Sequence, residues 1–128
     1  MDAKAVVIAY WQAMQSNDFY HASEWLSEDF TCDWPQSAER IKGRENFAAI
    51  NSAYPANGRW QFEVMSIVAE GTQVVTNVAV TDGVVRANAI TFHIVKDGLI
   101  HRQTEYWPDD YPAPEWRSAW VETLNVKE

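Results

Sequence analysis

The chain has 128 residues, of which 47% are hydrophobic, and it carries a formal net charge of −8 at pH 7. This length predicts one domain over residues 1–128 with a sizeable core. The acidic balance, without any run of Lys and Arg, argues against nucleic acid and membranes as partners, because nucleic acid and anionic lipid bind clustered positive charge. The single cysteine, Cys32, rules out an internal disulfide, so a reducing, cytoplasmic location is expected.

The N-terminal third is predicted to be mainly helical. Asp2 suits the N-cap of a helix over about residues 3–15, whose apolar residues recur every three or four positions. A second, short helix is predicted to begin after Asp18. The first 14 residues lack a basic region followed by a continuous apolar run, so neither a signal peptide nor a membrane span is expected.

A short strand is predicted over Phe30–Trp34, because Pro35 stops it and begins a polar loop over residues 36–42. Gly43 opens a third helix, which Pro55 ends.

The second half of the chain alternates with period two. Three β runs cover residues 60–69, 73–81 and 84–95, and a last strand follows Gly98. The connections Glu70-Gly71, Asp82-Gly83 and Asp97-Gly98 are short, so neighbouring strands should be antiparallel. The order of the elements predicts an α+β fold with a meander sheet.

The last strand carries the most reactive candidate. Period two places His101, Gln103, Glu105 and Trp107 on one face, so a carboxylate lies beside an indole. In a poorly solvated pocket such a carboxylate has a raised pKa and can carry a proton near neutral pH. The alternative is a structural ion pair between Glu105 and a nearby arginine, either Arg86 or Arg102.

The C-terminal tail is predicted to be extended at Pro112 and Pro114 and to end in a helix at about residues 112–125 that carries Trp116 and Trp120. This segment would act as a clasp. It either covers a sheet edge or closes the mouth of a cavity.

The segments QSNDFYHASEWLSEDFTCDWP, IKGRENF and VKDGLIHRQTEYW, in this order of elements, resemble the SnoaL-like branch of the NTF2-like superfamily. The resemblance implies a cone-shaped, NTF2-like (cystatin-like) fold, in which a curved antiparallel sheet wraps the N-terminal helices around an apolar pocket. It also implies homodimers through the outer sheet face. The same fold hosts ketosteroid isomerases, epoxide hydrolases, dehydratases, polyketide cyclases and proteins that only bind, so the fold alone does not settle the function.

The resemblance assigns roles to individual positions. Tyr10 matches the tyrosine of ketosteroid isomerases that donates to the substrate oxygen, but Trp34 and Thr91 stand where those enzymes carry two aspartates. An indole cannot replace a carboxylate base, so the isomerase mechanism is not expected in that form. Glu105 matches the last-strand acid of the similar epoxide hydrolases. Asn77 stands close to the position of their second acid, where it could orient a water or a carbonyl.

These observations lead to two hypotheses. The first is a cofactor-independent acid/base enzyme, of the isomerase, cyclase, hydrolase or dehydratase type, acting on a small oxygenated hydrophobic molecule. The second is a protein without catalytic activity that binds such a molecule, or that serves as a dimerisation module. No cofactor and no metal site is expected, because the sequence carries no metal-ligand motif.

Each hypothesis uses the same residues. In the enzyme, Glu105 moves the proton while Tyr10, Asn77 and His93 position or polarise the substrate. The expected ligand-binding residues are Met14, Trp25, Trp34, Phe47, Ile50, Tyr54, Trp60, Phe62, Thr91 and Trp107. A homodimer would use an apolar face formed by Val84, Ile90, Phe92 and Ile94.

Overall fold

The computed structural model describes residues 1–124 and consists of helical segments followed by one curved sheet. In chain order the elements are α1 (Ala3–Met14), α2 (Phe19–Ala22), η1 (Ser23–Trp25), β1 (Leu26–Trp34), β2 (Glu39–Lys42), α3 (Arg44–Ala53), β3 (Gln61–Glu70), β4 (Gln73–Thr81), β5 (Arg86–Lys96), β6 (Leu99–Tyr106) and η2 (Glu115–Trp120).

The six strands lie in the order β2-β1-β6-β5-β4-β3. Strands β3 to β6 form the predicted antiparallel meander, because tight turns connect each strand to the next. Strand β1 joins this meander in parallel alongside β6, and the sequence did not indicate that pairing. The pairing aligns Cys32 with Gln103 and so brings the end of β1 beside Glu105.

Strand β2 replaces part of the polar loop predicted over residues 36–42. It pairs with β1 at the edge of the sheet, and Ile41 is its one buried residue. An edge strand with a single inward apolar side chain gives almost no period-two signal, which explains why the sequence did not reveal it.

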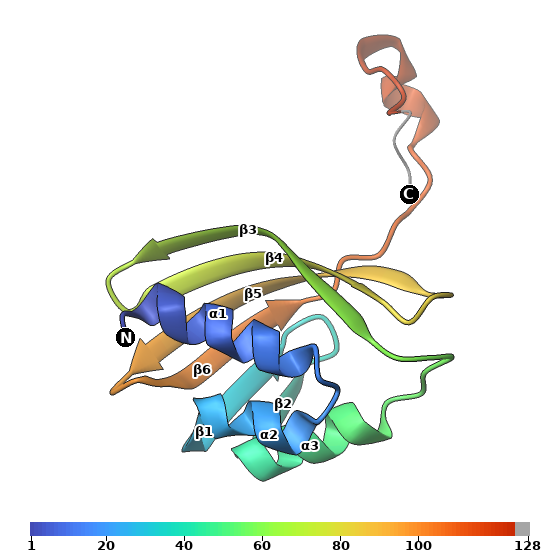
Figure 1. Cartoon of the computed structure of the whole chain (residues 1–128). Helices are drawn as coiled ribbons and strands as arrows, with labels where there is room; N and C mark the ends of the chain where they lie inside the picture. The colour runs from blue at the N-terminus through green and yellow to red at the C-terminus, as the bar shows by residue number, and fades with distance from the viewer. Residues whose placement is uncertain (125–128) are drawn as a thin grey trace.

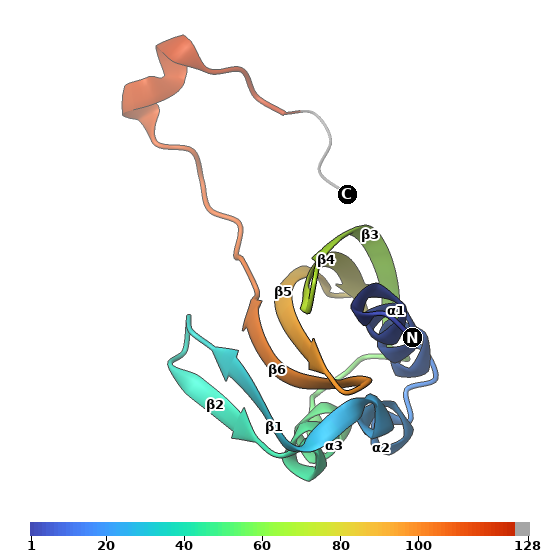
Figure 2. The same ribbon diagram turned by 90° about the vertical axis from the view of Figure 1, so that its left-hand side faces the viewer.

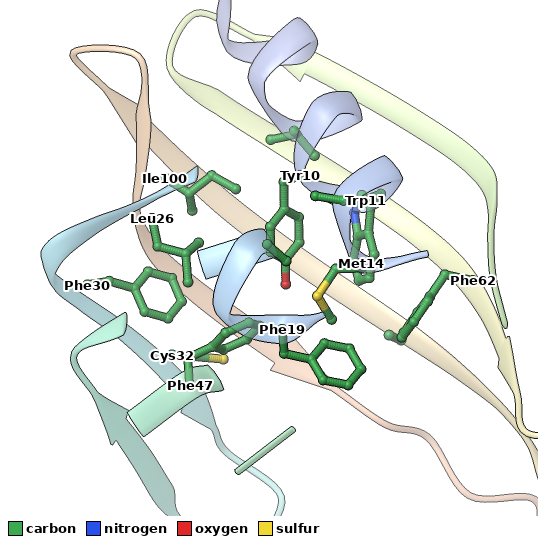
Figure 3. Packing of buried hydrophobic residues seen from close by; sticks show 14 of the residues in the cluster. Tyr10, Trp11, Met14, Phe19, Leu26, Phe30, Cys32, Phe47, Phe62 and Ile100 are labelled. Atoms are coloured by element: carbon green, nitrogen blue, oxygen red, sulfur yellow. The ribbon is translucent and has the colours of Figure 1, made fainter. Parts of the chain in front are cut away.

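Helix α1 lies in the hollow of the curved sheet, and α2 and α3 close the hollow from below, as Figures 1 and 2 show. The predicted cap is present, since the Ala5 N–H donates to Asp2 Oδ1 at 2.9 Å. Helix α1 buries Tyr10, Trp11 and Met14 against the sheet. Figure 3 shows these three side chains directed toward aromatic residues of α2, α3 and β3. The structure therefore has the α+β, cone-shaped architecture that the sequence predicts.

The C-terminal arm, which we define as residues 108–124, leaves the end of β6 and extends away from the body (Figures 1 and 2). The predicted clasp helix is reduced to the short 3-10 segment η2, in which no residue is buried. Residues 125–128 lie outside the described part of the chain. Apart from its first residues, which line pockets of the body, the arm does not fold back over its own chain, and Pro108, Pro112 and Pro114 favour an extended backbone.

Within residues 1–124, no helix is both long and apolar enough to cross a membrane.

Candidate functional site

A cavity of about 520 Å³ lies inside the cone between α1, α3 and the ends of the strands. Nine of the residues singled out in the sequence line it, namely Tyr10, Met14, Trp34, Phe47, Tyr54, Trp60, Phe62, Glu105 and Trp107. Trp25 and Ile50 are instead half-buried against the core. Sequence reasoning missed four polar residues that also line the cavity, Gln36, Ser37, Glu39 and Asn51, and Asp109 lines it as well. Gln36 and Ser37 lie in a loop without a periodic pattern.

Glu105 is a buried acid in the wall of this cavity. Its Oε1 accepts hydrogen bonds from Trp34 Nε1 at 3.0 Å and from Trp107 Nε1 at 3.2 Å. Its Oε2 accepts from Thr91 Oγ1 at 2.7 Å, across the β5–β6 pair. Within the described residues Glu105 forms no ion pair, so the alternative reading with Arg86 or Arg102 is not what the structure shows.

Among the described residues, these contacts leave one acceptor position on Glu105 free. A carboxylate oxygen offers two lone pairs, so the two indoles occupy Oε1 while Thr91 occupies only half of Oε2. Burial raises the pKa of Glu105, and the hydrogen bonds from Thr91, Trp34 and Trp107 partly oppose that effect. The free position on Oε2 can therefore take up a proton from a molecule in the cavity or return one to it.

Replacing Trp34 by Phe should raise the pKa of Glu105 further, because the ring is kept while one donor to the carboxylate is lost. Titration of the Glu105 carboxyl by carbon-detected NMR measures this shift. Trp25→Phe is the matched control, since Trp25 packs against the core and is not among the donors to Glu105. An unchanged Glu105 titration in Trp34→Phe would contradict the assigned contact.

Tyr10 projects from α1 into the same space, and its hydroxyl points away from the helix in Figure 3. Burial raises the pKa of Tyr10 well above its usual value, and the charge of Glu105 raises it further. Tyr10 is therefore a neutral phenol that can donate a hydrogen bond but does not ionise near neutral pH.

His93 belongs to a buried chain of hydrogen bonds behind the cavity. Trp11 Nε1 donates to Thr76 Oγ1 at 3.3 Å, Thr76 Oγ1 lies 2.8 Å from His93 Nε2, and His93 Nδ1 lies 2.7 Å from Gln103 Oε1. An indole N–H can only donate, so the Thr76 hydroxyl hydrogen is available to His93 Nε2, and the imidazole hydrogen lies on Nδ1. Both ring nitrogens are thus occupied by protein partners.

Desolvation lowers the pKa of His93 to about 4, so the ring is neutral at neutral pH. His93 lies opposite Gln103 in the β5–β6 pair, whereas Thr91 lies opposite Glu105. His93 therefore lies behind the cavity, where it contacts Thr76 and Gln103, and it is not beside the Glu105 carboxylate.

Gln103 links this chain to Tyr10. Its Nε2 makes no hydrogen bond within residues 1–124, yet the side chain lies close enough to the Tyr10 hydroxyl and the Cys32 thiol to lower the pKa of both, against the larger effect of burial. The Gln103 side chain therefore lies beside Tyr10 and Cys32, and its amide nitrogen is a buried donor without a partner among residues 1–124.

Asn77 lies on the opposite face of the sheet. Its side-chain oxygen accepts from Asn88 Nδ2 at 2.8 Å in an exposed contact, while its neighbours Thr76 and Val78 point inward. Period two separates Asn77 from the cavity, so the structure does not bring it together with Glu105. Within the described residues, no group of three or more His, Cys, Asp or Glu side chains could hold a metal ion.

Comparison with known proteins places this geometry in a family. The profile of the SnoaL-like domain matches residues 7–103. A solved structure from Kribbella flavida DSM 17836, named as a candidate ketosteroid isomerase, is 31% identical with a TM-score of 0.88, over 98% of this chain and 91% of its own. An NTF-2 like protein of unknown function from Burkholderia xenovorans LB400 is 32% identical with a TM-score of 0.78, over 96% and 95%.

An LEH-like epoxide hydrolase of M. tuberculosis is similar in fold, with 24% identity and a TM-score of 0.67 over 83% of this chain and 82% of its own. A comparison with curated proteins gives no significant match. The domain match covers most of the chain, and the cone-shaped fold agrees with it. The chain therefore belongs to the family of SnoaL-like domains within the NTF2-like fold.

Proposed function

We propose that the protein is a cofactor-independent acid/base enzyme that acts on a small, oxygenated hydrophobic molecule in the aromatic cavity. The observation that carries this proposal is the buried carboxyl of Glu105 in the cavity wall, with one acceptor position on Oε2 that no residue among 1–124 occupies. A raised pKa suits a group that must both take up and return a proton near neutral pH.

Two polar residues that line the cavity, Tyr10 and Glu105, fit a carbonyl substrate. Tyr10 offers a hydrogen-bond donor, which stabilises negative charge that develops on a carbonyl oxygen. Glu105 takes the proton from the adjacent carbon, the C–H electron pair becomes part of an enolate, and the proton then returns to a different carbon of the conjugated system. No atom is gained or lost, so the reaction is an isomerisation. The likeness to a protein named as a candidate ketosteroid isomerase supports a substrate of this class.

The proposal is tested with a β,γ-unsaturated 3-oxosteroid, 5-androstene-3,17-dione, by following the absorbance of the conjugated enone that forms. A second readout is exchange of the α-protons of simple cyclic ketones with deuterium, measured by NMR. We expect one of the two reactions to be faster with the protein than with buffer and bovine serum albumin. No acceleration of either reaction would contradict the carbonyl chemistry.

A second candidate function is binding without turnover. Trp34 and Thr91 stand where the similar isomerases carry aspartates, and both donate to Glu105, which favours a fixed carboxylate that anchors a ligand. Several tryptophans line the cavity, so ligand binding should quench the intrinsic fluorescence. Saturable quenching by the steroid, together with no product and no deuterium exchange, would select this function.

We also propose that the protein forms a homodimer through the outer face of the sheet. Phe92 is 46% exposed on β5 and contacts Tyr106 edge to face, with Ile90 and Ile94 half-buried on the same side. Val84, expected on this face, lies in the turn before β5. Phe92→Asp should convert the dimer to monomers in sedimentation velocity, because a charge cannot be buried unpaired in an apolar interface. A stable dimer that carries Phe92→Asp would contradict this interface.

A further inference from the structure

The cavity that contains Glu105 combines aromatic walls with acidic side chains. Nine of its lining residues are aromatic, and four of these are tryptophans. The charged residues in the lining are Glu39, Glu105 and Asp109, and no Lys, Arg or His among residues 1–124 lines the cavity. Aromatic rings attract cations over their faces, as carboxylates do, so both kinds of side chain favour the same sign of charge in a ligand.

Two of the acids lie at the opening of the cavity. Glu39 is the first residue of β2 and Asp109 lies in the arm just after β6, and both are exposed although both line the cavity. The Trp107 N–H donates to Gln36 Oε1 at 2.6 Å, which joins the loop before β2 to the start of the arm. The two acids are therefore brought to the same rim. Within residues 1–124 neither forms an ion pair.

The third acid lies inside. Glu105 is 5% exposed, and its Oε2 keeps the acceptor position that no described residue fills. Acidic groups therefore occur both in the interior of the cavity and at its opening. An anionic ligand would meet an acid at either place without a counter-ion, and unpaired like charges in a poorly solvated site are strongly unfavourable.

The neighbouring groove does not reverse this charge. Arg86 lines the groove of about 1060 Å³ that adjoins the cavity, and it is not among the residues that line the cavity itself. Glu63, Asp109 and Asp110 line the same groove, so its acids outnumber its base. The groove therefore offers no net positive charge to an anionic ligand. The whole chain, with a net charge of −8, has the same sign.

We propose that the ligand of this cavity is a cation, whose protonated or quaternary nitrogen lies against the aromatic walls and is paired with Glu39 and Asp109 at the opening. Cation–π attraction is strongest with tryptophan and where water is excluded, and both conditions hold in this cavity. The exposed carboxylates add an attraction that salt screens. The inference rests on the proposed function, because it names the charge of the molecule whose carbonyl Tyr10 and Glu105 would bind, but binding alone tests it.

Three ketones of closely similar shape and different charge test the proposal. They are the 4-acetyl-N,N,N-trimethylanilinium cation, the neutral 4-tert-butylacetophenone and the anion 4-acetylbenzenesulfonate. In isothermal titration calorimetry at low salt we expect the cation to bind about tenfold more tightly than the neutral ketone, and the anion to bind most weakly. A merely apolar cavity gives the opposite order for the first two, because the tert-butyl group is the more hydrophobic. Tighter binding of the neutral ketone, or no binding of the cation at millimolar concentration, would contradict the proposal.

A double variant tests the acids at the opening. Glu39→Gln/Asp109→Asn should weaken binding of the cation about threefold or more and leave binding of the neutral ketone unchanged, because only the charge is removed. Glu70→Gln/Asp97→Asn is the matched control, since it removes two exposed acids from turns of the sheet outside the cavity lining. An equal loss in the control would assign the preference to the net charge of the chain and overturn the proposal.

The aromatic wall is tested at Tyr54, which lines the cavity, is 55% exposed and meets Trp60 edge to face with ring centroids 6.4 Å apart. Tyr54→Leu keeps an apolar side chain but removes the ring, so it should weaken binding of the cation about two- to fivefold and spare the neutral ketone. Tyr54→Phe keeps the ring and should retain the preference. Equal losses for both ketones in Tyr54→Leu would contradict the cation–π contact.

The same ketones separate this inference from the proposed function. Exchange of their acetyl protons with deuterium reports the proposed chemistry, whereas calorimetry reports the charge preference. A preference for the cation without any exchange would contradict the enzyme and support the cationic ligand. Exchange together with tighter binding of the neutral ketone would support the enzyme and contradict the cationic ligand.

Discussion

Glu105→Gln is expected to lower kcat on any substrate that the protein turns over by about 10²- to 10⁴-fold, the usual contribution of one general acid or base. The amide keeps the shape of the side chain, so its oxygen still accepts from Trp34 and Trp107. The Thr91 hydroxyl can turn to accept from the new amide nitrogen. The variant thus retains the contacts of the site but cannot carry a proton.

The same substitution should not weaken the fold. Burial raises the pKa of Glu105, so the native state holds its proton to a higher pH than the unfolded chain does. This contribution to stability is fully present below the unfolded pKa of about 4.5 and is lost as the pH rises through the native pKa. Glutamine carries no charge to desolvate, so at neutral pH Glu105→Gln should unfold at an equal or higher denaturant concentration than wild type.

Glu70→Gln is the matched control, because this carboxylate lies at the far turn between β3 and β4. It should leave both kcat and the midpoint of denaturation unchanged. Full activity in Glu105→Gln would show that another group moves the proton. A large loss of stability in the same variant would show that Glu105 holds the fold together and is not a group reserved for chemistry.

His93→Leu is expected to destabilise the protein by about 2–6 kcal/mol, because two buried polar groups each lose a partner at a cost of about 1–3 kcal/mol. The groups are the Thr76 hydroxyl and the Gln103 side-chain oxygen. Leucine has nearly the volume of histidine, so the cavity term is small. Denaturation in urea at neutral pH measures the loss.

The pH dependence separates this role from simple packing. The pKa of His93 is lowered from 6.5 to about 4 in the native state, so between these values the unfolded chain binds more protons. The stability that a neutral His93 contributes is therefore present above pH 6.5 and is lost as the pH falls toward 4. Glu105 has the opposite effect, because its raised pKa makes its contribution to stability increase as the pH falls. The pH dependence of the free energy of unfolding of the wild type is therefore the sum of the effects of His93 and Glu105.

Comparison of variants resolves that sum. His93→Leu should lose less stability on acidification than wild type, and Glu105→Gln should lose more, because it leaves the effect of His93 unopposed. His101→Leu is the control, since His101 is only half-buried and contacts Ser27 and Asp29 near the surface. An acid dependence in His93→Leu that equals that of wild type would contradict the buried, neutral histidine.

The fold could be predicted from sequence wherever the local pattern was strong. Asp2 as the N-cap of α1, Gly43 before α3 and the short turns of the β3–β6 meander are local signals, and the structure confirms them. Strand β2 was missed because one inward Ile41 gives no alternation, and the helix expected at about residues 112–125 is only η2 in the described residues.

The sequence by itself determined that Gln103, Glu105 and Trp107 share one face of the last strand, because period two is a local property of any strand. Only the tertiary structure decided what faces them. The parallel pairing of β1 with β6 brings the Trp34 indole to Glu105. The register between β5 and β6 places Thr91 opposite Glu105 and His93 opposite Gln103. Such contacts depend on pairing between residues far apart in the chain, which no local pattern encodes, and the same dependence placed Asn77 on the outer face.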